Sequence, residues 1–571
     1  MKIVRTLQSK AFVGKNKKEK FDSIDSDICD FPNFRSFTKN ETRVFLLGNL
    51  LGISEVENLL SYSDCKIISD HVLNANGSFS IIIEKKDRLI AITDAAGSIP
   101  LYYGYGPGGF AVGNPVHEVA KATGLTTADE VSMIDFLCNH VVCYPYTWYQ
   151  NVFMAAPGSC TTFYPDGKIE VETYWQPREQ TDVYDSNVNI DFWAAKLKTE
   201  VKNAIERSLV DVKKLRVLFS GGEDSRAVLG LVPKGLEIIP STVLERKNRE
   251  YHLAKQAARL MGYNLDWIVR PPNYYRSELI EKAEMVGPGM DLRNTHMFGS
   301  LTKQLVDGDA ILGGYSADTL FKTNFLGNVL QSKRTKKESI SFPDSKYIHS
   351  LRYFEERGLL FRDDLVKEVK KRRLLHHNTI KKYRPLTAGN WHSLWPISNR
   401  NSYPHYLACL RIGTKVIEPF VDNKVYQLAS VMPDICRINR KVFNKAFAKE
   451  MGLAGWYPTS GGRIPAANNL WINYLYRLYK KYRKKIIEFE YEKGYGSSWS
   501  ADEGGWYPVN PADHFDEATC QFLNQNLAKV LKDGNPEKFW NNPINKRGLN
   551  ALKVRALTLA FDVEKIGSQN K

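Results

Sequence analysis

A short segment between residues 215 and 231 restricts the folds open to this chain more than any other stretch. Residues 215–219 form an apolar run, broken by one arginine, that is typical of a buried strand. A small-residue turn, Ser-Gly-Gly at residues 220–222, comes next, and the apolar residues 227–231 are typical of one side of a helix. A strand that passes through such a turn into a helix points main-chain N–H groups and the positive end of the helix dipole at an anion. The segment therefore predicts a phosphate-binding cradle; the alternative is an ordinary Gly-Gly turn before a helix.

Residues 220–225, S-G-G-E-D-S, resemble the pyrophosphate loop of ATP pyrophosphatases, which cleave ATP between its α- and β-phosphates. In this resemblance the glycines let the main chain approach the phosphates, and the serines donate hydroxyl hydrogen bonds. The aspartate can hold Mg²⁺, which accepts oxygen ligands and often bridges to phosphate. The loop lacks the G-K-[ST] ending of a Walker loop, which disfavours kinase and GTPase chemistry. The expected cofactor-binding residues of this stretch are Ser220, Gly221, Gly222, Asp224, Ser225 and Arg226.

The order of strand and helix patterns divides the chain into two architectures. Up to about residue 175 the sequence reads mainly as strands, and a polar linker follows at 176–189. From residue 215 to about 454 strands and helices alternate, which indicates a parallel sheet with helices on both faces. Strands of the first part are expected at 43–50, 77–84 and 88–93 and in a hairpin around 106–109. The expected domains are residues 1–180, residues 190–455 and an extension of the second domain, made of helices and loops, at 456–571.

The composition fits a folded chain of two or more domains. Of the 571 residues 43% are hydrophobic, which supports sizeable cores, and no run of 18 apolar residues indicates a transmembrane helix. No apolar segment near the first residue indicates a signal peptide. The eight cysteines contain no C-x-x-C pair, which favours reduced thiols over a disulfide framework or a zinc site and predicts a cytoplasmic protein.

The net charge of +16 is concentrated in runs of lysine and arginine. Such runs are usually solvated helix faces, and the alternatives are an acidic partner, a membrane surface or, less favoured, nucleic acid. The stretch 474–485 interleaves tyrosines with basic residues at roughly helical spacing, which suits a membrane interface or a helix that packs its tyrosines inward. The main runs are Lys15 to Lys20, Lys333 to Lys337, Lys367 to Arg373 and Arg477 to Lys485.

The order of several short motifs resembles the asparagine synthetase family over about residues 1 to 455. The motifs are N-G-S-F-S at 76–80, D-A-A-G-S-I-P-L-Y-Y at 94–103, Pro157-Gly158 with Tyr174-Trp175, the loop at 220–225, G-G-Y-S-A-D-T-L-F at 313–321 and P-F-V-D at 419–422. Each motif is weak alone, but their order over hundreds of residues is specific. The resemblance implies an α+β sandwich of the Ntn-hydrolase type, followed by an α/β pyrophosphate-loop synthetase domain that binds ATP and Mg²⁺. It also implies that Asp224 and Asp318 hold Mg²⁺ between them and that Gly314 lies at the nucleotide.

Departures from the family pattern indicate a branch without glutaminase activity. Family members that hydrolyse glutamine carry a cysteine directly after the initiator methionine, because the freed α-amine serves as the base for its thiol. This chain has Lys2 there, and its nearest cysteine is Cys29. The family's glutamine-holding segments are also absent from the first 75 residues. The chain thus resembles β-lactam synthetases, carbapenam synthetases and, in part, lasso peptide cyclases.

Three residues of the second domain are candidates for catalysis. Tyr315, three residues before Asp318, stands where asparagine synthetases have Glu, and β-lactam synthetase-type enzymes use such a tyrosine with a Glu partner to take a proton from an amine. The partner candidates are Glu355 and Glu356, and the alternative for Tyr315 is a packing role. The family also places a basic residue ahead of a late helix to stabilise charge at the adenylate. Arg440 and Lys441 match that place, with Lys441 favoured, and the alternative for both is surface charge.

The resemblance implies an AMP-forming amide ligase that adenylates a carboxylate and joins it to an amine. The acid and the amine are small molecules or peptides, and the sequence does not identify them. One alternative is an asparagine synthetase-like amidotransferase that uses ammonia, against which Tyr315 argues mildly. The other is a homologue that binds nucleotide without catalysis, against which the retained Ser220, Asp224 and Asp318 argue.

Overall fold

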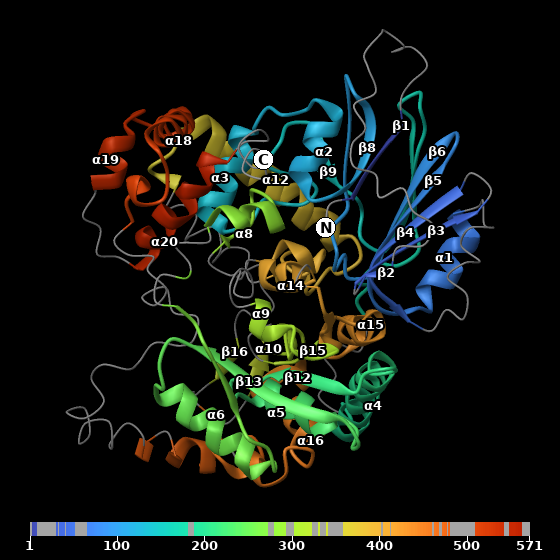
Figure 1. The fold of residues 1–571 in the computed structure, drawn as a ribbon, viewed down its shortest axis with the longest axis vertical. Helices are drawn as coiled ribbons and strands as arrows, with labels where there is room; N and C mark the ends of the chain where they lie inside the picture. Colours follow the sequence, from blue (N-terminus) through green and yellow to red (C-terminus); the bar gives the residue numbers. More distant parts are fainter. Residues whose placement is uncertain are drawn as a thin grey trace.

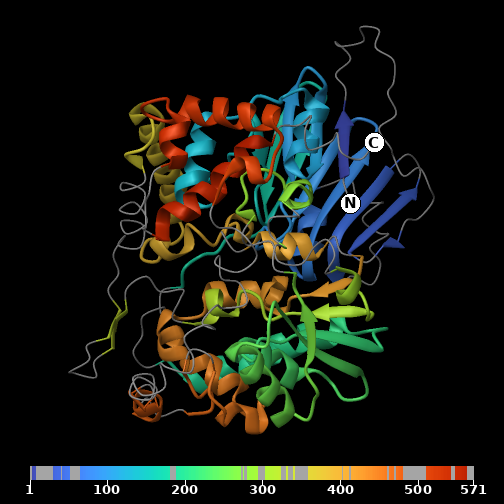
Figure 2. The same cartoon turned by 60° about the vertical axis from the view of Figure 1, so that its left-hand side comes forward.

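The computed structural model has two parts, one above the other, that meet through the segment containing α14 (Figure 1). The upper part holds the N-terminal strands and the C-terminal helices, and the lower part holds a parallel sheet with its helices; Figure 2 shows the same division from another side. The described residues are 3–7, 30–31, 33–39, 42–51, 65–180, 188–271, 274, 279–292, 302–322, 329–331, 338–340, 358–400, 403–410, 413–459, 462–467, 471–476, 478–479, 509–541 and 547–561.

The first 180 residues form two antiparallel sheets. A seven-stranded sheet has the order β11-β10-β6-β5-β4-β3-β2, and a four-stranded sheet has the order β1-β8-β7-β9. The expected strands at 43–50, 77–84 and 88–93 and the hairpin at 106–109 are confirmed. The strands are β1 (Ile3–Leu7), β2 (Asp30–Phe31), β3 (Phe34–Lys39), β4 (Thr42–Leu51), β5 (Asn76–Lys85), β6 (Arg88–Thr93), β7 (Tyr102–Gly106), β8 (Gly109–Asn114), β9 (Val152–Met154), β10 (Ser159–Phe163) and β11 (Ile169–Thr173).

Three helices accompany these sheets: α1 (Cys65–Leu73), α2 (Val116–Thr123) and α3 (Glu130–Asn139). A side-chain cap begins α3, because Asp129 accepts a hydrogen bond from the N–H of Val131. A disulfide joins Cys65 of α1 to Cys160 of β10, with their Cα atoms 5.9 Å apart. The prediction of reduced thiols is therefore wrong for this pair, because the fold brings together two cysteines that are 95 residues apart in sequence.

The lower part is built on a five-stranded parallel sheet with the order β14-β13-β12-β15-β18. Its strands are β12 (Lys214–Leu218), β13 (Glu237–Leu244), β14 (Asp266–Val269), β15 (Ala310–Leu312) and β18 (Lys415–Ile417). Arg216, which breaks the apolar run of β12, is buried, pairs with Asp266 and donates a hydrogen bond to Ser241 Oγ at 2.5 Å. The strand thus keeps its arginine inside the fold because the guanidinium is paired there.

The helices of the lower part are mostly short. α4 contacts α15 and α16, α5 contacts β12, and α6 contacts β13. The helices are α4 (Ile190–Ser208), α5 (Glu223–Leu231), α6 (Arg249–Leu260), α9 (Thr302–Leu305), α10 (Ala317–Phe321), α15 (Asn423–Val431), α16 (Lys441–Phe447) and the 3₁₀ turns η7 (Pro419–Val421), η8 (Asp434–Arg440) and η9 (Gly452–Trp456). Further elements are α8 (Leu279–Val286), the hairpin β16 (Val329–Gln331) with β17 (Glu338–Ile340), α12 (Asp363–Lys381), α13 (Ala388–Trp391), η6 (Ile397–Asn399) and α14 (Pro404–Cys409).

The C-terminal helices lie against the upper part (Figure 2). These elements are η10 (Pro511–Asp513), α18 (Glu517–Val530), α19 (Pro536–Asn541), α20 (Arg547–Ala556) and η11 (Leu557–Ala560). Both α18 and α20 contact α3, and the guanidinium of Arg555 donates to the main-chain oxygen of Leu137 at 2.8 Å. This placement differs from the expected extension of the second domain, because these helices bury their apolar sides against α3.

Motifs that are far apart in sequence meet where the two parts join. The N–H of Gly77 donates to Asp422 Oδ2 at 2.5 Å, and Ser78 Oγ donates to the oxygen of Val421 at 3.0 Å. The N–H of Ala95 donates to Asn423 Oδ1 at 3.0 Å. Hydrogen bonds between buried groups in both parts therefore fix the first two sheets to the start of α15.

Parts of the basic runs take structural roles. In α12, Arg372 pairs with Asp129, and Arg373 Nε lies 2.5 Å from Asp135 Oδ1. The runs at 15–20 and 333–337 and most of 474–485 lie outside the described residues. Among the described helices, none combines the length and the apolar character that crossing a membrane requires.

Candidate functional site

The glycine turn between β12 and α5 has the backbone that a phosphate cradle requires. Gly221 has a φ of +70°, and a Cβ at this position would lie 2.7 Å from Cα of Ala254 in α6. Gly222 precedes α5 without a side-chain hydrogen bond that caps the helix, and its own N–H donates to Ser220 Oγ at 3.3 Å. Because no side chain of Gly222 caps the start of α5, the N–H groups of its first turn can face an anion, and phosphate binding there stays a prediction.

The other polar residues of the turn face the protein. Ser225 Oγ donates to the oxygen of Gly222 at 3.2 Å. The buried guanidinium of Arg226 donates to the oxygens of Ala454, Tyr457 and Pro458 at 2.6, 2.5 and 3.1 Å. Arg226 thereby fixes the segment 454–458 beside the cradle; its predicted contact with phosphate or the acyl substrate stays a prediction.

Three carboxylates gather at the carboxyl end of the sheet around one lysine. Lys322, which follows α10, places its Nζ 2.9 Å from Asp318 Oδ1 and 3.4 Å from Glu223 Oε2, and it also pairs with Asp224. The side chain of Lys322 is 2% exposed, whereas that of Asp318 is 49% exposed. The structure thus brings Asp224 and Asp318 together, as the sequence predicts, but with a cation of the protein between them.

Burial and the neighbouring charges set the protonation of this cluster. Burial opposes the charge of Lys322, but the carboxylates of Asp224, Glu223 and Asp318 raise its pKa above the ordinary value. Burial acts to raise the pKa of Asp318 as well, yet the Lys322 ammonium holds it below the ordinary value. For Asp224, burial prevails over Lys322 and raises the pKa to about 7. Lys322 therefore carries its positive charge at neutral pH.

These residues do not fit a free magnesium ion as they stand. The Oδ1 atoms of Asp224 and Asp318 both contact Lys322 Nζ, so a magnesium ion between the two carboxylates would compete with the ammonium group for them. Within the described part of the chain, no group of three or more His, Cys, Asp and Glu side chains is arranged to hold a metal ion.

A second basic side chain completes the cluster. Arg440 has a φ of +62°, which directs the chain into α16, and its guanidinium pairs with Glu223 Oε2. Lys441 is the first residue of α16. Of the two candidates named from the sequence, Arg440 contacts the carboxylate cluster through Glu223, and the role of Lys441 stays a prediction.

Tyr315 lies between the cluster and a group of buried aromatic residues. Its ring is half-buried, with its centroid 5.8 Å from that of Tyr403 and 6.1 Å from that of His405. The N–H of Tyr315 donates to Glu418 Oε2 at 2.8 Å. The guanidinium of the half-buried Arg400 interacts electrostatically with Tyr315. Glu355 and Glu356, the partners expected from the sequence, lie outside the described residues.

Glu418 fixes the turn that carries Tyr315. A Cβ at Gly313 would lie 2.0 Å from Glu418 Oε1, so a larger residue there would force the carboxyl group of Glu418 to move. The buried side chains of Tyr403, Tyr406 and Cys409 interact electrostatically with Glu418. Burial raises the pKa of Glu418 to about 8, despite the hydrogen bond from Tyr315. The carboxyl group is therefore mostly protonated at neutral pH.

The Glu418→Gln variant is expected to lose less stability than the wild type as the pH rises. The folded-state pKa of Glu418 lies above its unfolded value, so the contribution of Glu418 to stability is largest below about pH 4.5 and is lost as the pH rises to about 8. Glutamine keeps an acceptor for the N–H of Tyr315 but does not titrate. Urea unfolding at several pH values measures the free energy of unfolding of both proteins. Within that pH window, the value for the variant minus that for the wild type should rise by at most roughly 1.4 kcal/mol per pH unit. A constant difference would mean that Glu418 is not buried as a neutral acid.

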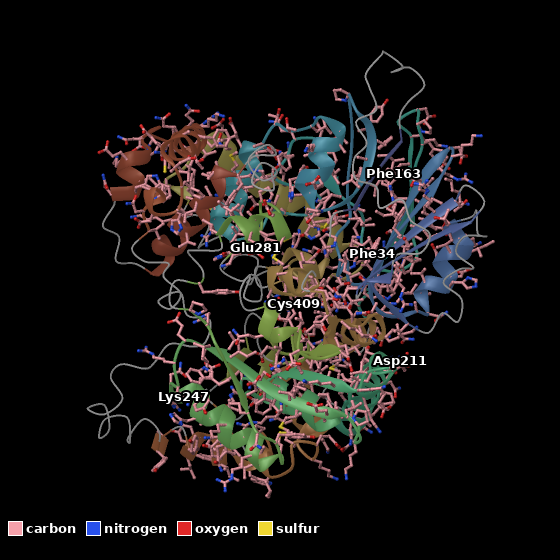
Figure 3. The ribbon with its side chains drawn as sticks, viewed as in Figure 1. Phe34, Phe163, Asp211, Lys247, Glu281 and Cys409 are labelled. Carbon is pink, nitrogen blue, oxygen red and sulfur yellow. A yellow bond between two sulfur atoms is a disulfide. The ribbon has the colours of Figure 1, made fainter. Side chains whose placement is uncertain are left out.

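Neither Lys322 nor Glu418 was predicted from the sequence as a residue of the site. Lys322 stands four residues after Asp318 and pairs with it, so an i,i+4 charge pattern could have indicated it. Glu418 follows the three-residue strand β18 and directly precedes the P-F-V-D motif at 419–422, but no sequence pattern assigned it a role. Cys409, labelled in Figure 3, lies at the end of α14 where the two parts meet, and it interacts electrostatically with Glu418.

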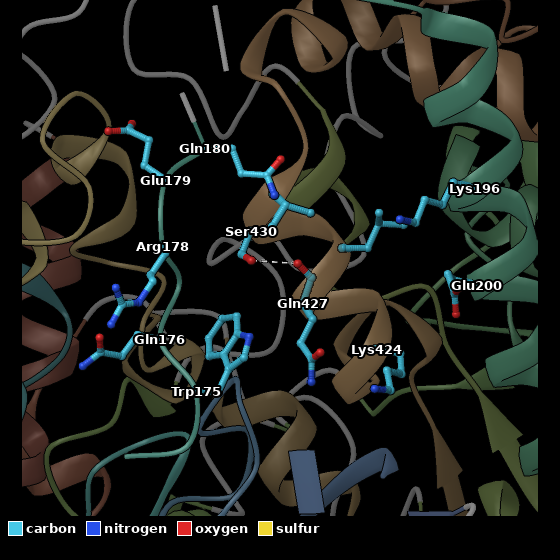
Figure 4. A pocket seen from close by; sticks show the side chains of 12 residues that line it. Trp175, Gln176, Arg178, Glu179, Gln180, Lys196, Glu200, Lys424, Gln427 and Ser430 are labelled. Atoms are coloured by element: carbon cyan, nitrogen blue, oxygen red, sulfur yellow. Dashed lines mark hydrogen bonds between the residues drawn. The ribbon is translucent and has the colours of Figure 1, made fainter. Parts of the chain in front are cut away.

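A pocket of about 390 Å³ lies away from the cradle, between the segment 175–180 and the helices α4 and α15 (Figure 4). Its polar side chains largely bond to the protein. Glu179 accepts from Thr387 Oγ1 at 2.6 Å and from the N–H of Leu386 at 2.9 Å, and Gln427 donates to the oxygen of Leu73 at 3.1 Å. The pocket thus belongs to the junction between the two parts and contains none of the candidate catalytic residues.

Comparison with models of known protein families finds no match, and a search of curated proteins finds none either. Among solved structures, the chain is similar to the allosteric regulatory enzyme of purine biosynthesis, at 12% identity and a TM-score of 0.17, over 41% of this chain and 62% of that chain. It is also similar to glutamine phosphoribosylpyrophosphate amidotransferase from B. subtilis complexed with ADP and GMP, at 13% identity and a TM-score of 0.15, over 48% and 56%. The chain spans less than two thirds of either structure, and at these TM-scores neither likeness carries a conclusion about function.

Proposed function

We propose that this protein is an ATP-dependent, AMP-forming amide ligase of the asparagine synthetase type without glutaminase activity. The observation that carries the proposal is the uncapped start of α5 after the Gly221-Gly222 turn, with Tyr315 and the charged cluster at the same edge of the parallel sheet. Ligands of such sheets collect at the carboxyl ends of the strands. In this proposal the lower part is a pyrophosphate-loop synthetase domain and the first two sheets are an Ntn-type sandwich.

The proposed reaction has two steps. First, a substrate carboxylate oxygen attacks the α-phosphorus of ATP, and the bond to the β-phosphate oxygen breaks to release pyrophosphate. The N–H groups at the start of α5 bind the phosphates, and Arg440 or Lys441 stabilises charge that develops on them. Second, an amine attacks the acyl carbon, and AMP leaves with the electron pair of the broken bond. ATP, with Mg²⁺ bound to its phosphates, is the proposed nucleotide.

Tyr315 is the proposed base of the second step. The proton leaves the amine nitrogen for the phenolate oxygen of Tyr315 as the new C–N bond forms. In the proposal, the positive charge of Arg400, which interacts electrostatically with Tyr315, stabilises the phenolate that this step requires. Glu418 acts through the main chain, since it fixes the turn on which Tyr315 stands.

The first two sheets serve as a scaffold in this proposal. Asp94 accepts hydrogen bonds from the N–H groups of Phe79 and Ser98 at 3.0 and 2.8 Å and from the hydroxyl of Ser98. The neighbouring Gly77 and Ala95 are bonded to Asp422 and Asn423 of the other part. These motif residues are therefore engaged in structure, which fits a domain that holds the synthetase part in place.

Product analysis tests the proposal. Purified protein, ATP, Mg²⁺ and labelled pyrophosphate are incubated with a panel of carboxylates that covers small metabolites, sugar acids and peptides. Exchange of label into ATP that depends on one of these acids, and AMP with pyrophosphate as products once an amine is added, are expected. Release of ADP and phosphate would contradict the proposal. Amide formation with ammonium alone would favour the ammonia-using alternative.

A further inference from the structure

Lys322 is buried and contacts three carboxylates at once, which an ordinary ion pair does not do. Its side chain is 2% exposed, and its Nζ lies among the carboxylates of Glu223, Asp224 and Asp318. The same Nζ lies 4.4 Å from the ring centroid of Phe443 in α16, a geometry that favours a cation over the ring. Four groups from α5, α10 and α16 thus hold the ammonium group in one place.

Carboxylates this close need a cation between them. Buried like charges repel strongly in a medium of low dielectric, and a buried charge without a partner is costly. Arg440 pairs with Glu223 from one side, whereas Lys322 contacts all three carboxylates. A divalent ion between Asp224 and Asp318 would have to compete with the ammonium group of Lys322 for their carboxylates.

We propose that Lys322 is the resident cation of this carboxylate cluster and keeps a free divalent ion out of the nucleotide-free protein. Asp224 and Asp318 therefore meet a metal ion only when it arrives bound to the phosphates of a nucleotide. Lys322 fixes the two side chains beside the cradle in the meantime. The role assigned to the nucleotide rests on the proposed function, but the binding of metal to the empty protein does not.

Manganese binding to the nucleotide-free protein tests the proposal. Electron paramagnetic resonance measures free Mn²⁺ in titrations of the wild type, Lys322→Met and Lys322→Arg. The wild type and Lys322→Arg are expected to show no Mn²⁺ binding that depends on Asp224. Lys322→Met leaves the carboxylates without their cation and should gain Mn²⁺ binding that the wild type lacks. Adding Asp224→Asn to Lys322→Met should remove this binding.

Two controls make the result specific. Lys214→Met removes another lysine that pairs with an acid, Asp307 at 2.8 Å, at the opposite end of β12, and it should leave Mn²⁺ binding unchanged. Thermal unfolding of Lys322→Met should show stabilisation by Mn²⁺ that the wild type lacks, because a ligand that binds only the folded state stabilises it.

Two results would overturn the proposal. One is Mn²⁺ binding to the wild type that Asp224→Asn abolishes, a comparison that holds even if Lys322→Met does not fold. The other is a folded Lys322→Met variant that binds no more Mn²⁺ than the wild type. Neither result depends on pyrophosphate exchange, so failure of the proposed function and failure of this proposal are distinguishable.

Discussion

Asp224→Asn is expected to reduce the exchange of labelled pyrophosphate into ATP by a factor on the order of 10² to 10³. Asp224 belongs to the first turn of α5, directly after the cradle, and contacts Lys322 together with Asp318. Asparagine keeps the size of the side chain but removes the charge that the proposed metal–nucleotide complex would meet. The exchange assay with the wild type's own acid substrate measures the loss.

Loss of folding has to be separated from loss of chemistry in this variant. Removing one partner of a buried ion pair destabilises a protein, so the thermal unfolding midpoint of Asp224→Asn is measured alongside. Asp309→Asn is the matched control, because Asp309 accepts from the N–H groups of Lys213 and Lys214 at 2.8 Å each, before the first residue of β15. This control should retain exchange. A folded Asp224→Asn protein with full exchange would remove the pyrophosphate loop from the proposed reaction.

The fold could be predicted from local patterns wherever an element is long or strongly patterned. The strand at 88–93 matches β6 residue for residue, because turns limit its apolar run. The three-residue strand β18 was not predicted. Its position is set by pairing with β15, which no local pattern shows.

The placement of the C-terminal helices could not be predicted either. Their apolar sides indicate burial but not the partner. In the structure, α18 and α20 pack on α3, and Arg555 reaches the main-chain oxygen of Leu137, which lies 418 residues earlier. Contacts at such a separation depend on the assembled fold, so an apolar helix face predicts that it is covered but not what covers it.

The candidate site also contains features that the sequence predicts and features that it does not. Motif residues predicted the cradle and the meeting of Asp224 with Asp318, because both follow strands of one parallel sheet. The sequence did not predict that Lys322 lies between these two carboxylates. Lys322 and Asp224 are 98 residues apart, so only the side-by-side arrangement of β12 and β15 brings the ammonium group to both carboxylates.

Tyr315→Phe is expected to preserve pyrophosphate exchange and to slow amide formation by about 10² to 10⁴-fold, the range for loss of a general base. Phenylalanine keeps the ring against Tyr403 and His405, at centroid distances of 5.8 and 6.1 Å, and keeps the main-chain hydrogen bond to Glu418. Single-turnover formation of the amide, measured beside exchange, separates the two steps. The variant should therefore lose the hydroxyl alone.

Tyr403→Phe is the control, because it removes a buried hydroxyl from the ring that packs on Tyr315. It should leave amide formation within a few-fold of the wild type, since the proposal gives its hydroxyl no part in proton transfer. Equal losses of exchange and amide formation in Tyr315→Phe would mean that the tyrosine shapes the site for both steps. Unchanged amide formation would assign Tyr315 to packing. Either result would favour ammonia as the nucleophile, because the case for an amine-directed ligase depends largely on this hydroxyl.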